Sequence, residues 1–303
     1  MSIAVTVAEP KAIEIACEDG VPLRGHIWPH ARGEKAGTII VNPATGVLAR
    51  YYHRYAAFLS GHGFDVITFD YRGIGASRPA NLRKCNYRWR DWGERDFEAV
   101  LRLARRIDSG APLMVVGHSI GGVLPGLAES APGIARMLTV GAQYAFWRDY
   151  AADRRLRLFL KWHVAMSVLT ALLGYFPGKL LGWLEDLPRG VANEWSFRGA
   201  RMELSHPRAE RESVLRRLAS VSAPILAVGV TDDELGTPQA IARALAYYSG
   251  ANTTQVLLSP GDFDKREIGH FSLFHDRHAS GFWLETLIWL RDGLNPWPGK
   301  VVG

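Results

Sequence analysis

Residues 113–122, LMVVGHSIGG, decide how this sequence is interpreted. Four apolar residues lead into Gly117, and a single serine, Ser119, stands between that glycine and Gly121. The apolar run predicts a buried strand, and the residues after the serine predict a helix. The spacing G-x-S-x-G between a strand and a helix is typical of a strained turn that exposes a nucleophilic serine. Ser119 is therefore a candidate nucleophile, with a glycine-rich turn as the alternative.

A serine hydroxyl becomes an effective nucleophile where a base accepts its proton and a third group holds that base. His270 is the candidate base, because it follows Gly269 in a loop between the last predicted strand and the final predicted helix. That loop lies at the carboxyl edge of the predicted sheet, the edge that also carries Ser119. We therefore expect the two side chains to meet although they are far apart in the chain.

Two further histidines, His275 and His278, lie nearer the start of the final predicted helix and are expected on the surface. A metal site that combines them with Asp276 is the alternative, but their spacing matches no zinc-ligand pattern. The glycines at 73 and 75 lack the third glycine of a dinucleotide-binding loop. We therefore expect neither a metal nor a cofactor.

The acid that holds the histidine is expected after a strand between the serine and the histidine. Asp232 and Asp233 follow the apolar residues 225–230, with only Thr231 between. Their spacing alone does not distinguish them, and either could be an ordinary turn or helix-capping aspartate. The triad would then follow the order serine, aspartate, histidine along the chain.

Strands and helices are expected to alternate along most of the chain, which predicts a mostly parallel sheet covered by helices on both faces. Strands are expected within residues 12–29 (a hairpin), 38–46, 64–77, 112–119, 135–143, 224–234 and 253–260, and helices within 51–63, 92–110, 120–130, 238–250 and 279–294. Residues 1–143 and 220–303 would then form one core.

Residues 144–219 interrupt this alternation and are too long and too apolar for a simple linker. We expect an inserted helical cap. This segment has 13 Lys and Arg against 8 Asp and Glu, so most of the net charge of +6 lies there. A lid that touches an anionic membrane surface is one interpretation; a cap packed on the core, with its arginines in solvent, is the other. In both, the apolar residues are expected to line a cavity for a hydrophobic or acyl-bearing substrate.

The motifs NPATG (42–46), FDYRGIGAS (69–77) and GHSIGG (117–122), together with TDDE (231–234) and GHF (269–271), give the sequence a clear resemblance to the α/β-hydrolase fold superfamily. The resemblance covers nearly the whole chain and is weakest in the cap. It is strongest to the serine-aminopeptidase-like or lysophospholipase-like branch, which includes many predicted hydrolases. The motifs are specific to the fold and not to a substrate.

The resemblance also implies roles for individual residues. The backbone N–H groups of Ala44 and Ile120 would form the oxyanion hole, although His-Gly is usual in the family where this chain has Asn-Pro at 42–43. Asp233 would be the catalytic acid, with Asp232 in reserve. The loop residues Asp70, Arg72 and Ser77 are expected to be structural.

The function expected is that of a serine hydrolase acting on a carboxylic ester-type bond through an acyl-enzyme, with Ser119, His270 and Asp233 as the triad. Two alternatives use the same fold for other chemistry: an acyltransferase, or a cofactor-independent haloperoxidase-type enzyme. A third is a non-catalytic binding module, which the presence of all three triad candidates disfavours.

Composition restricts the partners and the compartment. The chain is only mildly basic, so nucleic-acid binding is not expected. Two cysteines, Cys17 and Cys85, and an N-terminus without the features of a signal peptide favour a cytoplasmic protein with reduced thiols. The longest uncharged stretch, residues 164–178, is shorter than a membrane span. The sequence does not specify an oligomeric state.

Overall fold

The computed structural model describes residues 9–31 and 33–302. Residues 1–8, on which the prediction of no signal peptide partly depends, lie outside the described residues. The chain forms a sheet with strand order β1-β2-β4-β3-β5-β6-β9-β10. Its strands are β1 (Lys11–Ala16), β2 (Pro22–Trp28), β3 (Gly37–Asn42), β4 (Phe64–Phe69), β5 (Leu113–His118), β6 (Arg136–Val140), β9 (Ile225–Val230) and β10 (Thr253–Leu258).

The sheet is mostly parallel, as the sequence predicts. β1 and β2 form the predicted antiparallel hairpin, and β2 also pairs antiparallel with β4. All pairs from β4 across to β10 are parallel. The carboxyl ends of β3, β5, β6, β9 and β10 therefore share one edge, and the loops that follow them can meet there.

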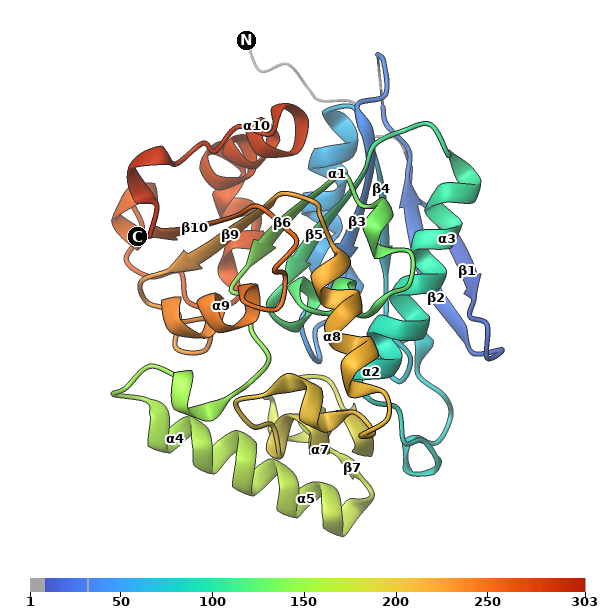
Figure 1. The fold of residues 1–303 in the computed structure, drawn as a ribbon, viewed down its shortest axis with the longest axis vertical. Coiled ribbons are helices and arrows are strands. Elements are labelled where there is room, and N and C mark those ends of the chain that lie inside the picture. The colour runs from blue at the N-terminus through green and yellow to red at the C-terminus, as the bar shows by residue number, and fades with distance from the viewer. Residues whose placement is uncertain (1–8, 32, 303) are drawn as a thin grey trace.

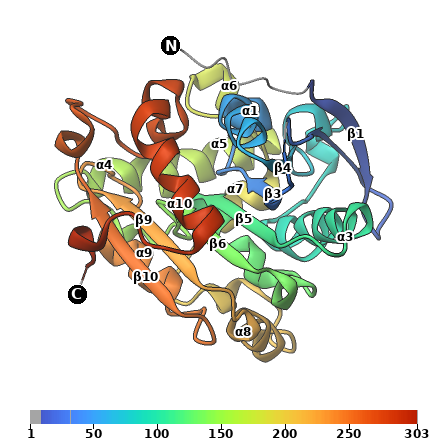
Figure 2. The ribbon, with the colours of Figure 1, turned by 90° about the horizontal axis from the view of Figure 1, so that it is seen from above.

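Helices cover both faces of this sheet (Figures 1 and 2). Side chains of α1 and α10 pack in the apolar cluster on one face, and side chains of α3, α8 and α9 pack in the cluster on the other face. The bounds are α1 (His53–Gly61), α2 (Trp89–Asp91), α3 (Glu98–Ile107), α8 (Arg211–Ser220), α9 (Pro238–Leu245) and α10 (Leu284–Asp292). π-helical turns join α2 to α3 (Trp92–Phe97) and precede α10 (Ala279–Trp283).

The helix predicted over residues 120–130 is wrong. The structure has two short 3₁₀ turns there, Ser119–Gly122 and Leu124–Leu127. Pro125 has no backbone N–H to donate and its ring obstructs a continuing α-helix. Gly121 and Gly122 also lower the helical propensity of this stretch. The turn after the serine therefore has no long helix behind it.

Between β6 and β9 the chain leaves the sheet and forms a second layer beside the carboxyl edge (Figure 1). Its elements are α4 (Arg155–Phe159), α5 (Met166–Leu173), β7 (Tyr175–Phe176), α6 (Gly178–Leu181), β8 (Leu187–Pro188) and α7 (Arg189–Ser196), with a π-helical turn (Leu160–Ala165) between α4 and α5. α8 returns to the core and packs on the 3₁₀ turn Leu124–Leu127, where Leu218 lies against Gly126. The cap boundaries of 144 and 219 stay a prediction.

Candidate active site

Ser119 lies directly after β5, on a turn whose backbone is strained. Its φ angle is 54°, a value that few residues other than glycine adopt. A Cβ atom at Gly117 would lie 2.5 Å from the Gly121 carbonyl oxygen, and one at Gly121 would overlap the Asn42 carbonyl oxygen. Both flanking glycines are therefore required by close backbone approach. Strain of this kind is often retained at a functional site.

The loop after β10 brings His270 to the loop after β9. The Nδ1 atom of His270 lies 2.7 Å from Oδ2 of Asp233. Asp233 Oδ1 accepts the backbone N–H groups of Leu235 (2.8 Å) and Gly236 (2.7 Å). Burial alone would raise the pKa of Asp233, but His270 and these N–H groups outweigh it and hold the pKa below its usual value. Asp233 therefore stays ionised and fixes the imidazole.

Asp232, the reserve candidate, has a different environment. Its carboxylate accepts the backbone N–H groups of Ile268 (2.8 Å) and Gly269 (3.1 Å). These bonds connect the loop after β9 to the loop that carries His270. Asp232 thus contacts the backbone before the histidine, and Asp233 contacts its ring. Spacing alone could not distinguish these adjacent aspartates because both follow the same strand, whereas the family resemblance implies Asp233.

His118, immediately before Ser119, is a buried residue that the sequence analysis did not single out. Its ring centroid lies 5.1 Å from that of His270, and its Nε2 atom lies 2.8 Å from the His270 carbonyl oxygen. A carbonyl oxygen only accepts, so Nε2 carries the hydrogen. Burial and the neighbouring His270 lower the pKa of His118 to about 3, so the ring is neutral at ordinary pH.

The neutral His118 ring fixes the direction of a chain of hydrogen bonds. Because Nε2 donates, Nδ1 accepts, and the Tyr52 hydroxyl donates to it at 2.7 Å. The Tyr52 oxygen in turn accepts the backbone N–H of Ala44 at 3.0 Å. This chain runs from the loop after β3 to the backbone of His270. It connects two loops that the sequence analysis assigned to the site.

The two predicted oxyanion donors therefore have different surroundings. The N–H of Ala44 donates to Tyr52. Ile120 lies in the first turn of the 3₁₀ segment after Ser119, where N–H groups have no partner within the helix. Asn42, which stands where the family usually has histidine, donates through Nδ2 to the Gly121 carbonyl oxygen at 3.2 Å. That bond holds the loop after β3 against the serine turn.

The loop after β6 contributes two residues that no sequence motif indicated. Nε2 of Gln143 donates to Oγ of Ser119 at 3.4 Å. Gly141 packs against the contact between Asp233 and His270. A Cβ atom at this position would lie 2.9 Å from Asp233 Oδ2 and 3.1 Å from His270 Nδ1. Its φ of 56° also favours glycine. The one available signal was position, since both residues lie at the carboxyl end of the strand predicted within residues 135–143.

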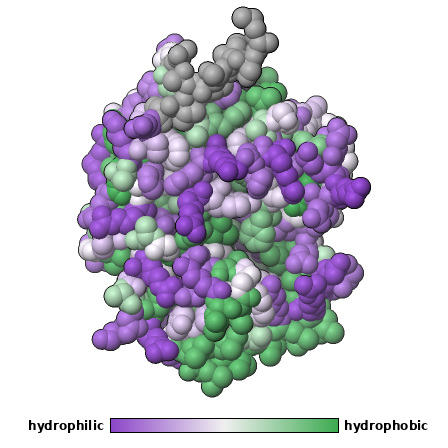
Figure 3. Space-filling view, turned by 180° about the vertical axis from the view of Figure 1, so that it is seen from behind, coloured by the Kyte–Doolittle hydropathy of each residue, from purple (hydrophilic) through white to green (hydrophobic). Residues whose placement is uncertain are grey.

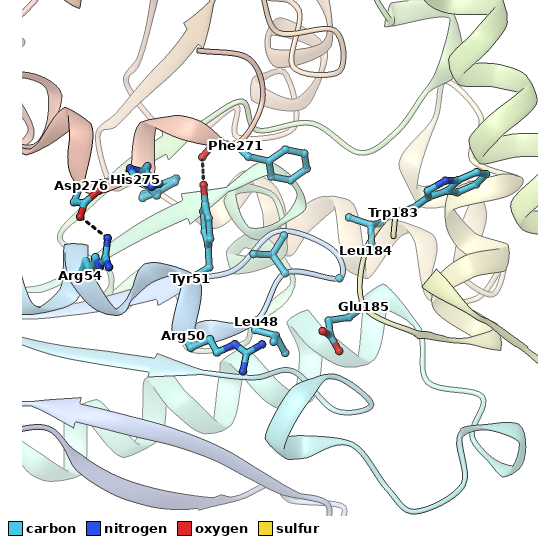
Figure 4. A pocket seen from close by; sticks show the side chains of 13 residues that line it. Leu48, Arg50, Tyr51, Arg54, Trp183, Leu184, Glu185, Phe271, His275 and Asp276 are labelled. Atoms are coloured by element: carbon cyan, nitrogen blue, oxygen red, sulfur yellow. Dashed lines mark hydrogen bonds and ion pairs between the residues drawn. The ribbon is translucent and has the colours of Figure 1, made fainter. Parts of the chain in front are cut away.

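The three triad candidates are enclosed. The exposed fractions are 6% for Ser119, 5% for Asp233 and 8% for His270. A cavity of about 640 Å³ is lined by segments 46–54, 183–185 and 271–276, and none of the three triad candidates lines it. Figure 4 shows Tyr51, which donates to the Phe271 carbonyl oxygen at 2.8 Å, and the ion pair of Arg54 with Asp276. Phe271 follows His270 directly, so the cavity reaches the loop that carries the candidate base.

Residues of the 69–77 loop make bonds within the fold. Arg72 is fully buried and pairs with Asp96 (2.5 Å) and Asp19 (2.6 Å). Asp70 accepts the backbone N–H groups of Ala49 (2.7 Å) and Ala76 (2.9 Å). The Ser77 hydroxyl donates to the Asp70 carbonyl oxygen. These contacts fit the structural role that the resemblance implies for Asp70, Arg72 and Ser77.

The prediction that His278 lies on the surface is wrong. His275 is exposed, but His278 is 2% exposed and packs edge-on against Phe263. The sequence pattern missed it because π-helical and 3₁₀ turns, and not a regular helix, precede α10 and turn the ring inward. Within residues 9–31 and 33–302, no group of three His, Cys, Asp or Glu side chains is arranged to hold a metal. Cys17 and Cys85 are not joined by a disulfide.

Comparison with known proteins identifies relatives of this chain. The sequence pattern of the Alpha/beta hydrolase family matches residues 39–280. The monoglyceride lipase of Saccharomyces cerevisiae is 26% identical over 106 residues, which are 34% of this chain and 34% of that enzyme. The match therefore spans about a third of the length of that lipase.

Solved structures extend the likeness over almost the whole chain. A soluble variant of the Saccharomyces cerevisiae monoglyceride lipase, in complex with a substrate analogue, has a TM-score of 0.65 at 16% identity and covers 96% of this chain and 97% of that one. An esterase of Pyrococcus furiosus has a TM-score of 0.58 at 16% identity, with 92% and 91% covered. At these identities the likeness concerns the fold alone.

Proposed function

The chain belongs to the alpha/beta hydrolase family, and from this premise we propose that it is a serine hydrolase cleaving a carboxylic ester-type bond in a hydrophobic, acyl-bearing small molecule. The observation that carries the proposal is the 2.7 Å contact of His270 with Asp233 at the sheet edge where Ser119 occupies a strained turn. An ionised carboxylate on Nδ1 leaves Nε2 of His270 as the nitrogen that accepts the serine proton.

The proposed reaction has two halves. Oγ of Ser119 attacks the ester carbonyl carbon while Nε2 of His270 takes the hydroxyl proton. The tetrahedral intermediate collapses, the C–O bond to the alcohol breaks, and His270 gives its proton to the leaving oxygen. Water, deprotonated by His270, then attacks the acyl-enzyme and releases the acid and the free serine. Asp233 stays ionised throughout and stabilises the imidazolium.

Backbone N–H groups stabilise the oxyanion in this proposal. The Ile120 N–H lies next to Ser119 at the start of a helical turn and is the first donor. The Ala44 N–H is the second donor, and it must share its hydrogen between Tyr52 and the oxyanion or turn away from Tyr52. Tyr52 therefore becomes a residue on which the shape of the oxyanion hole depends.

The cavity favours a substrate with apolar parts. Its lining includes Val47, Leu48, Trp183, Leu184, Phe271 and Phe274. Such side chains favour an acyl chain over a charged group, with Arg50, Arg54 and Glu185 at the same cavity for polar contacts. The lipase and esterase among the relatives are consistent with this substrate class.

The test is a panel of p-nitrophenyl esters from acetate to decanoate, with Ser119→Ala and the matched control Ser249→Ala at an exposed turn. We expect the wild type and the control to hydrolyse the panel and Ser119→Ala to fall by about 10⁴-fold or more, towards background. Ester hydrolysis retained by Ser119→Ala would refute the nucleophile. If an alcohol is added and the wild type then forms more ester product than free acid, the protein is an acyltransferase. If the wild type turns over no ester at all, the result indicates a binding module.

A further inference from the structure

Residues 155–173, named here the cap helix, have two apolar stripes on opposite faces. The inward stripe is Leu158, Trp162, Met166 and Thr170, with exposed fractions of 2%, 4%, 0% and 0%. The outward stripe is Leu156, Leu160, Val164, Val168 and Leu172, with 71%, 51%, 40%, 51% and 76%. Both stripes repeat every four residues, the spacing of one face of a helix. The inward stripe packs on the molecule and the outward stripe has no cover within the described residues.

The outward stripe forms a surface feature of the molecule. Figure 3 shows a continuous green area at its lower end, where Figure 1 places α5. Scattered apolar side chains are normal on a surface, but a contiguous apolar patch usually marks a contact with a partner or a membrane. From the sequence, the apolar residues of the cap are expected to line a cavity. For these five residues that expectation is wrong, because they face away from the molecule.

The charge around the stripe indicates which partner covers it. Residues 154–184 contain five basic side chains and no acidic one, but Arg154 pairs with the adjacent Asp153 and Lys179 with Glu185. The other three basic side chains are Arg155, Arg157 and Lys161. Arg157, next to Leu156, is exposed. A helix with one strongly apolar face and basic residues beside it binds anionic lipid surfaces through both features. The apolar stripe and the basic side chains together favour an anionic lipid surface as the partner.

The cap helix fits an orientation on the membrane better than one across it. Its 19 residues are long and apolar enough to span a bilayer. The uncharged stretch 164–178 covers only part of this helix and is too short for a span. A span would carry Arg155, Arg157 and Lys161 into the hydrocarbon at one end. It would also remove the inward stripe from the neighbours that bury it, among them α7 and β7. Both costs are avoided if the helix lies in the plane of the interface.

We propose that the outward stripe of the cap helix docks the protein on an anionic lipid surface, with the helix lying in the plane of the interface. Lys161 links this helix to the cavity, because its Nζ atom lies 4.6 Å from the centre of the Trp183 ring and Trp183 lines the cavity. The docked face and the cavity wall are thus neighbours. The proposal stands without the proposed hydrolysis, because lipid binding is measured without turnover.

The experiment is flotation of the full chain with vesicles of phosphatidylcholine alone or with 30% phosphatidylglycerol. We expect binding to the anionic vesicles that weakens with added salt. Leu156→Gln/Leu172→Gln should weaken it at least tenfold, and Arg157→Gln about fivefold. The matched control is Ile107→Gln/Leu294→Gln, which changes two aliphatic side chains outside the cap that are 50% and 63% exposed. This control should bind like the wild type.

Several outcomes would overturn the proposal. One is the absence of binding to either vesicle by a folded wild type. Another is binding that the Leu156→Gln/Leu172→Gln variant retains in full. A third is a dimer in sedimentation that this variant alone dissociates, because a second copy of the chain would then cover the stripe. Binding that resists alkaline extraction would show a spanning helix. Ser119→Ala should float like the wild type, which separates this test from that of catalysis.

Discussion

The central strands and the cap helix are both rich in apolar residues, but they bury them to different extents. Every residue of β3, β5 and β9 is buried. In the cap helix, the inward stripe is buried and the outward stripe, from Leu156 to Leu172, is between 40% and 76% exposed. Folding alone accounts for the strands, which lie between two layers of helices. It does not account for the outward stripe, for which we propose a contact with a lipid surface.

This difference separates the residues proposed for catalysis from those proposed to bind lipid. Ser119, Asp233 and His270 follow β5, β9 and β10 at the carboxyl edge of the sheet. The cap helix carries none of them. Changes at the strand ends should therefore alter catalysis at any lipid concentration. Changes on the outward stripe should alter lipid binding and leave the chemistry intact.

The largest expected effect distinguishes the two adjacent aspartates. Asp233→Asn should lower kcat for a soluble ester by about 10⁴-fold, because Nδ1 of His270 loses the carboxylate that fixes its tautomer. Asp232→Asn is the matched control and should lower kcat by no more than about tenfold, since it removes only backbone contacts to residues 268 and 269. Steady-state kinetics on both variants measures this. Equal losses would mean that the acid is wrongly assigned.

The next effect is on stability and depends on pH. The folded protein holds the pKa of His118 at about 3, against about 6.5 in an unfolded chain. The unfolded state therefore binds the extra proton between pH 6.5 and 3, and stability falls as pH falls through that window. At pH 4 this one residue should cost about 3 kcal/mol relative to pH 7.

His118→Asn should therefore flatten the dependence of unfolding free energy on pH between 6.5 and 4, whatever its effect at pH 7. Urea unfolding at several pH values gives this slope. Part of the pH dependence should remain in the variant, because burial also lowers the pKa values of three other histidines to about 4: His53, His206 and His278. An unchanged slope would show that His118 does not stay neutral in the folded protein.

Much of the fold could be predicted from the sequence because the parallel strands are continuous apolar runs ending in recognisable turns. Every strand predicted in the sheet is present, and the Asp19–Gly20 turn has the positive φ of 79° that Gly20 allows. The prediction failed where local turns override helical patterns. Pro125 breaks the stretch after Ser119, and the turns before α10 bury His278.

A third prediction concerns two buried tyrosines of similar position. Tyr52 bonds both the Ala44 N–H and His118 Nδ1, whereas Tyr55 makes one bond, to Thr286. Tyr52→Phe leaves two buried polar groups without partners and should cost about 2 to 4 kcal/mol. Tyr55→Phe should cost about 1 kcal/mol, because the Thr286 hydroxyl keeps its bond to the Trp283 carbonyl oxygen. Urea unfolding at pH 7 compares the two variants. Equal losses of unfolding free energy would contradict the chain of hydrogen bonds through Tyr52.

The site was only partly predictable for a physical reason. Ser119, Asp233 and His270 sit in local motifs that reflect backbone strain or strand ends. Tyr52, His118 and Gln143 act through contacts between distant segments, such as the bond from Gln143 to Ser119. No local pattern encodes those contacts. The exposure of the outward stripe is likewise set by which face of the cap helix packs on α7, and the sequence has apolar residues on both faces.

The smallest expected effect is the one that separates the two regions. Leu156→Gln/Leu172→Gln should hydrolyse a short soluble ester within about twofold of the wild type, because both side chains point away from the triad and the core. The same variant should act more slowly on esters presented in anionic vesicles. The ratio of the two rates is the measurement. A large loss on the soluble ester would mean that the stripe supports the active site itself.

The central claim is that the edge of the buried sheet carries an activated serine, and active-site labelling tests it most directly. A fluorophosphonate forms a P–O bond with an activated serine oxygen and releases fluoride. We expect one label per chain, located by peptide mass spectrometry on Ser119, labelling slowed about 10²-fold or more in His270→Ala, and none in Ser119→Ala. A label on another residue, or equal labelling of Ser119→Ala, would contradict the account.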